Sequence, residues 1–283
     1  MLLVITTTSC LGAQQKVDLG NNAALRYWSA FAQMQDFGMT DQQAKETNLI
    51  LEGTAPYDDS KYKDLLEKNR GALNTMTRGV TISKCDWGLD YQLGPATPIE
   101  YVRKALALGR LNILYSFHLL ITGDQDGAVR TLAAGLHFSR DVANDGTLFA
   151  TLAAKSLAVE HLRAIAFVMH MHQLSAAQRD ILRDGLTPFG QDGLDWQAAM
   201  RRELGLLSPS SVPSLDGQAV SALKRITPAY LKIFDNPGAL PELQQEIANA
   251  PQSVRDIIPN PKRVLEERQT LSSKLRETRS ILQ

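Results

Sequence analysis

Short breaks between long apolar stretches are the feature that most constrains the fold of this chain. Gly123-Asp124 and Asp145-Gly146 each interrupt an apolar pattern with a 3.6-residue period, and each break is only two residues long. A connection of that length forces the helices on either side to lie antiparallel. Residues 98–122 and 125–144 are therefore expected to form a helical hairpin.

A second hairpin is expected from residues 147–172 and 175–188. The spacing of the two hairpins lies in the range of helical repeat arrays. In such arrays each hairpin stacks on its neighbour to bury its apolar face. Because no segment alternates convincingly in the manner of a strand, the predicted fold class is all-α: stacked antiparallel helical hairpins, with a C-terminal helical extension.

Capping signals precede several of these stretches. Each combines a hydroxyl or amide side chain with a glutamine, a glutamate or a proline shortly after it. They stand at Thr40-Asp-Gln-Gln43, Thr97-Pro-Ile-Glu100, Ser175-Ala-Ala-Gln178 and Asn260-Pro261. Gly146 is expected to take a positive φ angle between one helix and the next, which Thr147 would cap. Helices are predicted over 22–36, 41–52, 60–78, 98–122, 125–144, 147–172, 175–188, 193–207, 217–234, 240–249 and 261–282.

Four segments are expected along the chain. The longest breaker-rich stretch, at 205–217, begins and ends with a glycine and contains four serines and two prolines between them, which predicts a loop or linker. It separates a helical hairpin array at 14–204 from a C-terminal helical segment at 218–283. Residues 1–13 form a predicted signal peptide.

The first residues indicate export. No charge precedes Lys16, and Ala13 supplies the small residue expected before a cleavage site. We therefore expect a periplasmic or cell-envelope location. Two alternatives remain open: a lipid anchor at Cys10, and an N-terminus that stays in the cytoplasm.

Charge and motifs exclude several classes of function. The chain has 30 basic and 30 acidic side chains, and this balance argues against a nucleic-acid partner. The apolar stretch from 147 to 171 contains Lys155, Glu160 and Arg163, whose cost in a bilayer argues against a membrane span. No familiar catalytic, phosphate-binding or zinc motif is present, so neither a metal nor a cofactor is expected. His170 and His172 would share a metal only if their helix ended between them.

Two resemblances support the fold prediction. The segment Gly123-Asp-Gln-Asp-Gly-Ala128 and the apolar helix after it look like the second helix of a tetratricopeptide repeat, without that repeat's signature Trp, Leu-Gly and turn proline. More broadly, the chain resembles uncharacterised exported helical proteins of bacteria, through Asn22-Ala-Ala-Leu-Arg-Tyr-Trp28 and Cys85-Asp-Trp-Gly88. That resemblance covers most of residues 20–190. It implies a helical fold and no particular activity.

The segment from Cys85 to Pro95 is the first candidate site. Asp86, Trp87, Asp90 and Tyr91 combine carboxylates with aromatic rings, as sites that contact sugars or peptides do. In the alternative interpretation, which we favour, Trp87 plugs the end of the array and the aspartates form caps and turns. A similar sequence, Gly193-Leu-Asp-Trp-Gln197, follows later in the chain.

Glu160 is the second candidate. It lies on an apolar helix together with Lys155 and Arg163, and a buried charge needs a partner. We expect these side chains to pair with each other or with the adjacent hairpin. The alternative is a catalytic or ligand-binding carboxylate at Glu160.

The last predicted helix carries one apolar stripe, formed by Val264, Leu271, Leu275 and Leu282. This stripe predicts that the helix docks on the array, and a partner or membrane-surface helix is the alternative. Two hypotheses of function follow from the sequence as a whole. The favoured one is a non-catalytic, exported binding protein for a protein or peptide partner. The other is an envelope hydrolase that acts on glycan or peptide through Asp86, Asp90 or Glu160.

Overall fold

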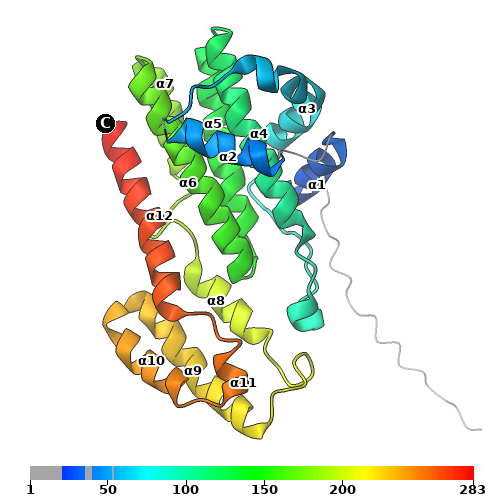
Figure 1. Cartoon of the computed structure of the whole chain (residues 1–283), viewed down its shortest axis with the longest axis vertical. Coiled ribbons are helices and arrows are strands. Elements are labelled where there is room, and N and C mark those ends of the chain that lie inside the picture. The colour runs from blue at the N-terminus through cyan, green and yellow to red at the C-terminus, as the bar shows by residue number, and fades with distance from the viewer. Residues whose placement is uncertain (1–20, 36–39, 53) are drawn as a thin grey trace, which may run out of the picture.

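The structure is a computed structural model, which describes residues 21–35, 40–52 and 54–283. Within these residues the fold is all-α, as predicted (Figure 1). The predicted signal peptide and Cys10 lie outside the described residues. The longer helices are α1 (Ala23–Gln33), α2 (Asp41–Leu51), α3 (Asp59–Gly79), α4 (Glu100–Ile121), α5 (Gln125–Ala143), α6 (Leu148–Met171), α7 (Ala176–Leu186), α8 (Trp196–Gly205), α9 (Gly217–Asp235), α10 (Leu240–Ala248) and α12 (Pro261–Ile281).

Three helices form the centre of the molecule. Helices α4 and α5 pack as the predicted hairpin, and α6 packs against both of them (Figure 1). Gly109 permits a close approach here, because a Cβ at this position would lie 2.4 Å from Cδ1 of Leu157. Helices α1 and α3 cover α4 on one side of this core. The interior is therefore built on the 98–172 region in which the sequence pattern is clearest.

Helix α7 does not follow the expected pairing. Residues 147–172 and 175–188 do not pack as a hairpin, because α7 lies against α5 instead of α6. The contact is close at Gly185, where a Cβ would lie 3.1 Å from Cα of Ala133. The chain leaves α6 through His172 in an extended conformation, and this turns the short α7 toward the neighbouring helix.

The C-terminal helix docks on the core, as its apolar stripe predicts. Helix α12 returns from the α9–α10 end of the molecule and packs along α6 and α7 (Figure 1). Its stripe is buried at Val264, Leu271, Leu275 and Leu282. Polar contacts fix the helix as well, since Lys155 Nζ lies 2.7 Å from Glu267 Oε2. The short helix α11 (Gln252–Arg255) and two 3-10 turns, η2 (Tyr91–Ala96) and η3 (Pro237–Ala239), are not among the predicted elements.

Most of the predicted caps form, and two do not. Thr40 and Ser175 make capping boxes, and Asn260 and Thr147 cap their helices. Thr97 does not cap α4, which begins at Glu100; its hydroxyl donates to the Asp90 and Gly94 carbonyl oxygens and closes the η2 turn.

The second correction concerns the turn between α5 and α6. Asp145, and not Gly146, takes the positive φ angle, at 50°. Gly146 meets a different constraint, because a Cβ there would lie 2.7 Å from Cβ of Ala150. The glycine is therefore used for close packing, and the aspartate, which tolerates the left-handed region, makes the turn.

Candidate functional site

Trp87, the most prominent residue of the first candidate site, is a core residue. Its side chain is 5% exposed and stacks on Tyr101, with the ring centroids 4.1 Å apart. The indole Nε1 donates to the carbonyl oxygen of Asp141 at 2.8 Å. This placement corresponds to the plug interpretation of Trp87.

A buried carboxylate organises the residues around Trp87. The Tyr27 hydroxyl donates to Asp141 Oδ2 at 2.6 Å, and Arg140 Nε donates to Oδ1 at 2.9 Å. Burial raises the pKa of Asp141, while Arg140 lowers it. The Cys85 thiol is buried beside this group, and desolvation raises its pKa, so it is a poor nucleophile. These contacts tie α1, the Cys85–Trp87 segment and α5 together.

Asp86 and Asp90 are exposed and stabilise turns. Asp86 Oδ1 accepts from the Gly88 amide at 2.9 Å, and Asp90 Oδ1 accepts from the Gln92 amide at 3.0 Å. Gly88 has a φ of 67°, which explains the glycine in this tight segment. The carboxylates thus serve the local backbone.

The later Gly193-Leu-Asp-Trp sequence repeats this geometry. Gly193 has a φ of 85°, and Asp195 accepts from the Ala198 amide at 2.9 Å to cap α8. Both segments therefore combine a glycine at positive φ with an aspartate cap. The similarity of the two sequences reflects the same way of starting a helical turn.

Tyr91 connects three parts of the chain. Its hydroxyl donates to the carbonyl oxygen of Asp145 in the α5–α6 turn. The Arg202 guanidinium of α8 lies over its ring, 5.4 Å from the centroid. Tyr91 is half-buried, and its contacts hold η2 against α8 and this turn.

Glu160 forms an ion pair with the adjacent hairpin. Arg110 of α4 donates to its two carboxylate oxygens, from Nε at 3.1 Å and from a terminal nitrogen at 3.0 Å. The Glu160 side chain is 7% exposed. Hydrogen bonding to this carboxylate raises the pKa of Arg110. The pair joins α4 to α6 at a buried position.

A buried histidine marks the centre of the three-helix core. His161 Nδ1 lies 2.8 Å from the Leu157 carbonyl oxygen, and Nε2 lies 3.1 Å from Asn112. Burial lowers the pKa of His161 to about 4. A neutral ring with its proton on Nδ1 needs a donor opposite Nε2, and the Asn112 amide supplies one if its Nδ2 faces the ring. That arrangement also satisfies Nδ2, which otherwise lacks a partner.

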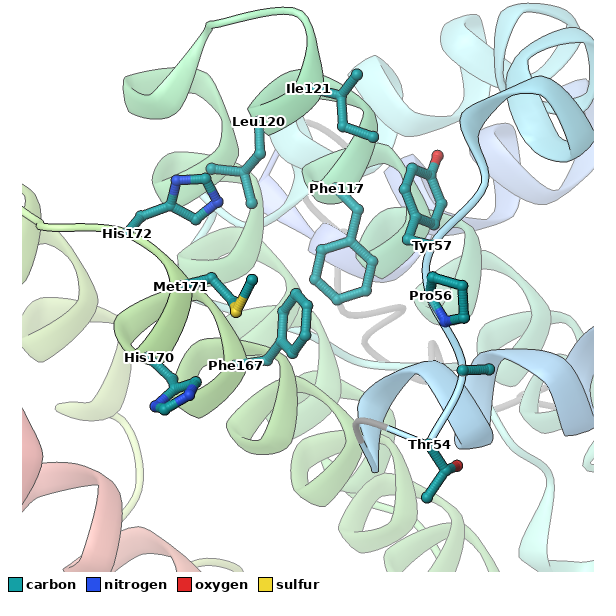
Figure 2. Close-up of a pocket in the computed structure, with 11 residues that line it drawn as sticks. Thr54, Pro56, Tyr57, Phe117, Leu120, Ile121, Phe167, His170, Met171 and His172 are labelled. Atoms are coloured by element: carbon teal, nitrogen blue, oxygen red, sulfur yellow. The ribbon is translucent and has the colours of Figure 1, made fainter.

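The structure contains an apolar groove that the sequence analysis did not identify. It has a volume of about 670 Å³ and lies where the α2–α3 connection meets the C-terminal ends of α4 and α6 (Figure 2). None of the five predicted site residues lines it. Most of its lining is apolar, and the larger side chains are Pro56, Tyr57, Phe117, Leu120, Ile121, Phe167 and Met171.

Aromatic packing forms the wall of this groove. The Phe117 ring makes edge contacts with Tyr57 on one side, at 5.6 Å between centroids, and with Phe167 on the other, at 5.4 Å. The Tyr57 hydroxyl donates to Asp59 Oδ1 at 3.0 Å, and His118 Nδ1 lies 2.8 Å from the same oxygen. The α2–α3 connection is thereby held against the end of α4.

The edge of the groove exposes large apolar side chains. Ile121 and Met171 are each 59% exposed and flank the opening. His170 and His172 line the groove as well, and Figure 2 shows their rings on either side of Met171. Helix α6 ends at Met171, between the two histidines. Even so, no three potential metal ligands gather anywhere in the described part of the chain.

A smaller cavity of about 230 Å³ lies between the α5–α6 turn and α8. Arg140 and Arg202 contribute to it, but both have partners: Arg140 binds Asp141, and Arg202 donates to Asp145 and to the Gly146 carbonyl. Its charged groups are therefore engaged in holding the fold.

Comparison with protein-family models, with curated proteins and with solved structures found no match. Of the helices described, none combines the length and the apolar character that crossing a membrane requires. The resemblance to exported helical proteins stays a prediction.

Proposed function

We propose that this protein is a non-catalytic binding protein, which holds an apolar segment of a protein or peptide partner in the groove at the ends of α4 and α6. The observation that carries the proposal is the combination of a lined cavity with exposed apolar side chains at its edge. Cavities of several hundred Å³ with mainly apolar linings are typical binding sites.

The edge of the groove favours a peptide over a small molecule. Ile121 and Met171 line the cavity and are each 59% exposed, so a ligand that continues past the cavity, as a peptide does, can cover more of their apolar surface. Methionine side chains adapt to varied partners, and Met171 is suited to that role. A cell-envelope location is part of the proposal and rests on the first residues of the sequence alone.

The hydrolase hypothesis has weaker support. Glycan hydrolysis through paired carboxylates requires two carboxyl groups that face one cleft. Asp86 and Asp90 instead bond to amides of their own turns, and both oxygens of Glu160 bind Arg110. The groove provides the better-supported site.

The test is selection of binding peptides from a random library on the whole protein, followed by affinity measurements on two variants. Ile121→Gln changes the groove edge. Phe149→Gln changes a side chain of similar exposure, 56%, at the other end of α6. We expect apolar, aromatic-rich peptides whose affinity falls about tenfold in Ile121→Gln, as expected for loss of a buried aliphatic contact.

The control variant Phe149→Gln should bind the same peptides as tightly as the original protein does. The proposal is overturned if no peptide is selected, or if the selected peptides bind Ile121→Gln with unchanged affinity. Circular dichroism of both variants checks that the helices are retained.

A further inference from the structure

We infer that the groove selects peptide segments in which an acidic group adjoins the apolar side chains, and that His170 and His172 recognise that group. This inference rests on the proposed function and adds the chemistry of the partner. The polar atoms of the groove are decisive here, because in an apolar site a few polar atoms determine specificity.

The two imidazoles are the polar side chains available to a ligand. Of the other lining residues, Thr54 has a hydroxyl that donates to the Leu49 carbonyl, and Tyr57 has one that donates to Asp59. His170 and His172 are exposed, and no hydrogen bond joins either imidazole to another described residue. Helix α6 ends between them, and this allows both rings to border the same cavity (Figure 2).

Three acidic groups on the bordering segments have partners of their own. Asp59 binds His118, Asp124 accepts from the Gly127 amide at 2.8 Å, and Asp126 accepts from Gln178 at 2.6 Å. Asp124 caps α5, whereas Asp59 and Asp126 bond to side chains of neighbouring helices. None of these three carboxylates bonds to an imidazole of the groove, so both imidazoles can pair with a group that a partner brings.

The backbone at this end of the bundle makes the imidazoles necessary for binding an anion. The groove lies at the C-terminal ends of α4 and α6, where helix dipoles place partial negative charge. An imidazole donates a hydrogen bond in either protonation state and carries a positive charge when both of its nitrogens are protonated. Without the imidazoles, the groove should prefer an uncharged ligand to an anionic one.

Two dyes with the same aromatic rings, one anionic and one uncharged, separate the contribution of the anionic group to binding from that of the apolar rings. N-phenyl-1-naphthylamine is uncharged. 1-anilinonaphthalene-8-sulfonate adds an anionic sulfonate, which stands in for the acidic group of the proposed peptide partner. Fluorescence titration at about pH 6 gives the affinity of the protein for each dye. We expect the original protein to bind the anionic dye more tightly.

In His170→Gln/His172→Gln the affinity for the anionic dye should fall about tenfold, the loss expected for one charge-assisted hydrogen bond. Affinity for the uncharged dye should stay within about twofold, so the order of preference reverses. Glutamine keeps the size and polarity of the side chain and cannot become positive.

The possible results separate failure of the inference from failure of the proposed function. If the uncharged dye binds and Ile121→Gln lowers its affinity, the groove is supported as the binding site. Equal loss of both dyes in the histidine variant, or no loss of the anionic dye, then overturns the inference alone. If Ile121→Gln changes the affinity for neither dye, the groove itself is rejected.

Discussion

The two ends of the α4–α6 core use their polar and aromatic residues in opposite ways. At the Trp87 end, Asp141 receives hydrogen bonds from Tyr27, Arg140 and Trp87, and the rings are buried. At the groove end, Ile121 and Met171 are exposed, and two imidazoles border an open cavity. Buried polar groups whose hydrogen bonds are satisfied stabilise a fold, whereas an exposed apolar surface is typical of a site that binds a partner. The comparison indicates a structural role for the first end and supports the proposed binding at the second.

The largest effect on stability is expected at the Trp87 end. Asp141→Ala removes the acceptor for Tyr27 and Arg140 and should lower the free energy of unfolding by about 3 kcal/mol. Urea denaturation measures the change. Asp86→Ala is the matched control, because it removes only an exposed turn contact and should cost less than about 1 kcal/mol. Equal effects of the two substitutions would contradict a structural role for the Asp141 cluster.

The buried His161 should make the stability of the protein depend on pH. The pKa of His161 is about 4 in the folded protein and ordinarily near 6.5 when unfolded, so between these values only the unfolded chain binds the proton. Stability should therefore fall by about 2–3 kcal/mol as the pH drops from about 6.5 to about 4.5.

His161→Gln isolates this contribution. The variant cannot take up the proton in either state, while the buried carboxyl groups of Asp141 and Glu203 titrate in both proteins. The difference between the two stability curves should shrink as the pH falls. Parallel curves across this range would show that His161 is not held neutral in the core.

The smallest effect on stability is expected at the groove. Ile121→Gln and Met171→Gln change exposed side chains and should alter the free energy of unfolding by no more than about 0.5 kcal/mol. Thermal or urea unfolding checks this. A loss above about 1.5 kcal/mol would mean that these side chains contribute to the fold, and the contrast between the two ends would weaken.

Local sequence signals predicted the helices well. Capping boxes at Thr40 and Ser175 and the proline start at Pro261 each use residues within one turn of the helix, and they occur as expected. Thr97 shows the limit of such signals, because its hydroxyl donates to carbonyl oxygens of the η2 turn and does not cap α4. The choice between two local partners depends on where the preceding segment docks.

Contacts between distant segments were harder to predict. The pattern in α6 required a partner for Glu160, and the adjacent hairpin supplies it through Arg110. No pattern indicated that α7 would pack on α5, since its apolar face fits either neighbour. The groove was missed for a similar reason: Phe117 and Phe167 lie among many other apolar residues of α4 and α6, and the sequence pattern does not distinguish them from core residues. The one available signal was Ile121 and Met171, large apolar residues beside helix ends.

We propose that the partner binds at the groove end and that the Trp87 end is structural. The most direct test measures the affinity of one library-selected peptide for Ile121→Gln and for the double variant Asp86→Ala/Asp90→Ala. We predict about a tenfold loss in the first variant and an unchanged affinity in the second. A loss confined to the aspartate variant would contradict the account and would place binding on the segment around Trp87.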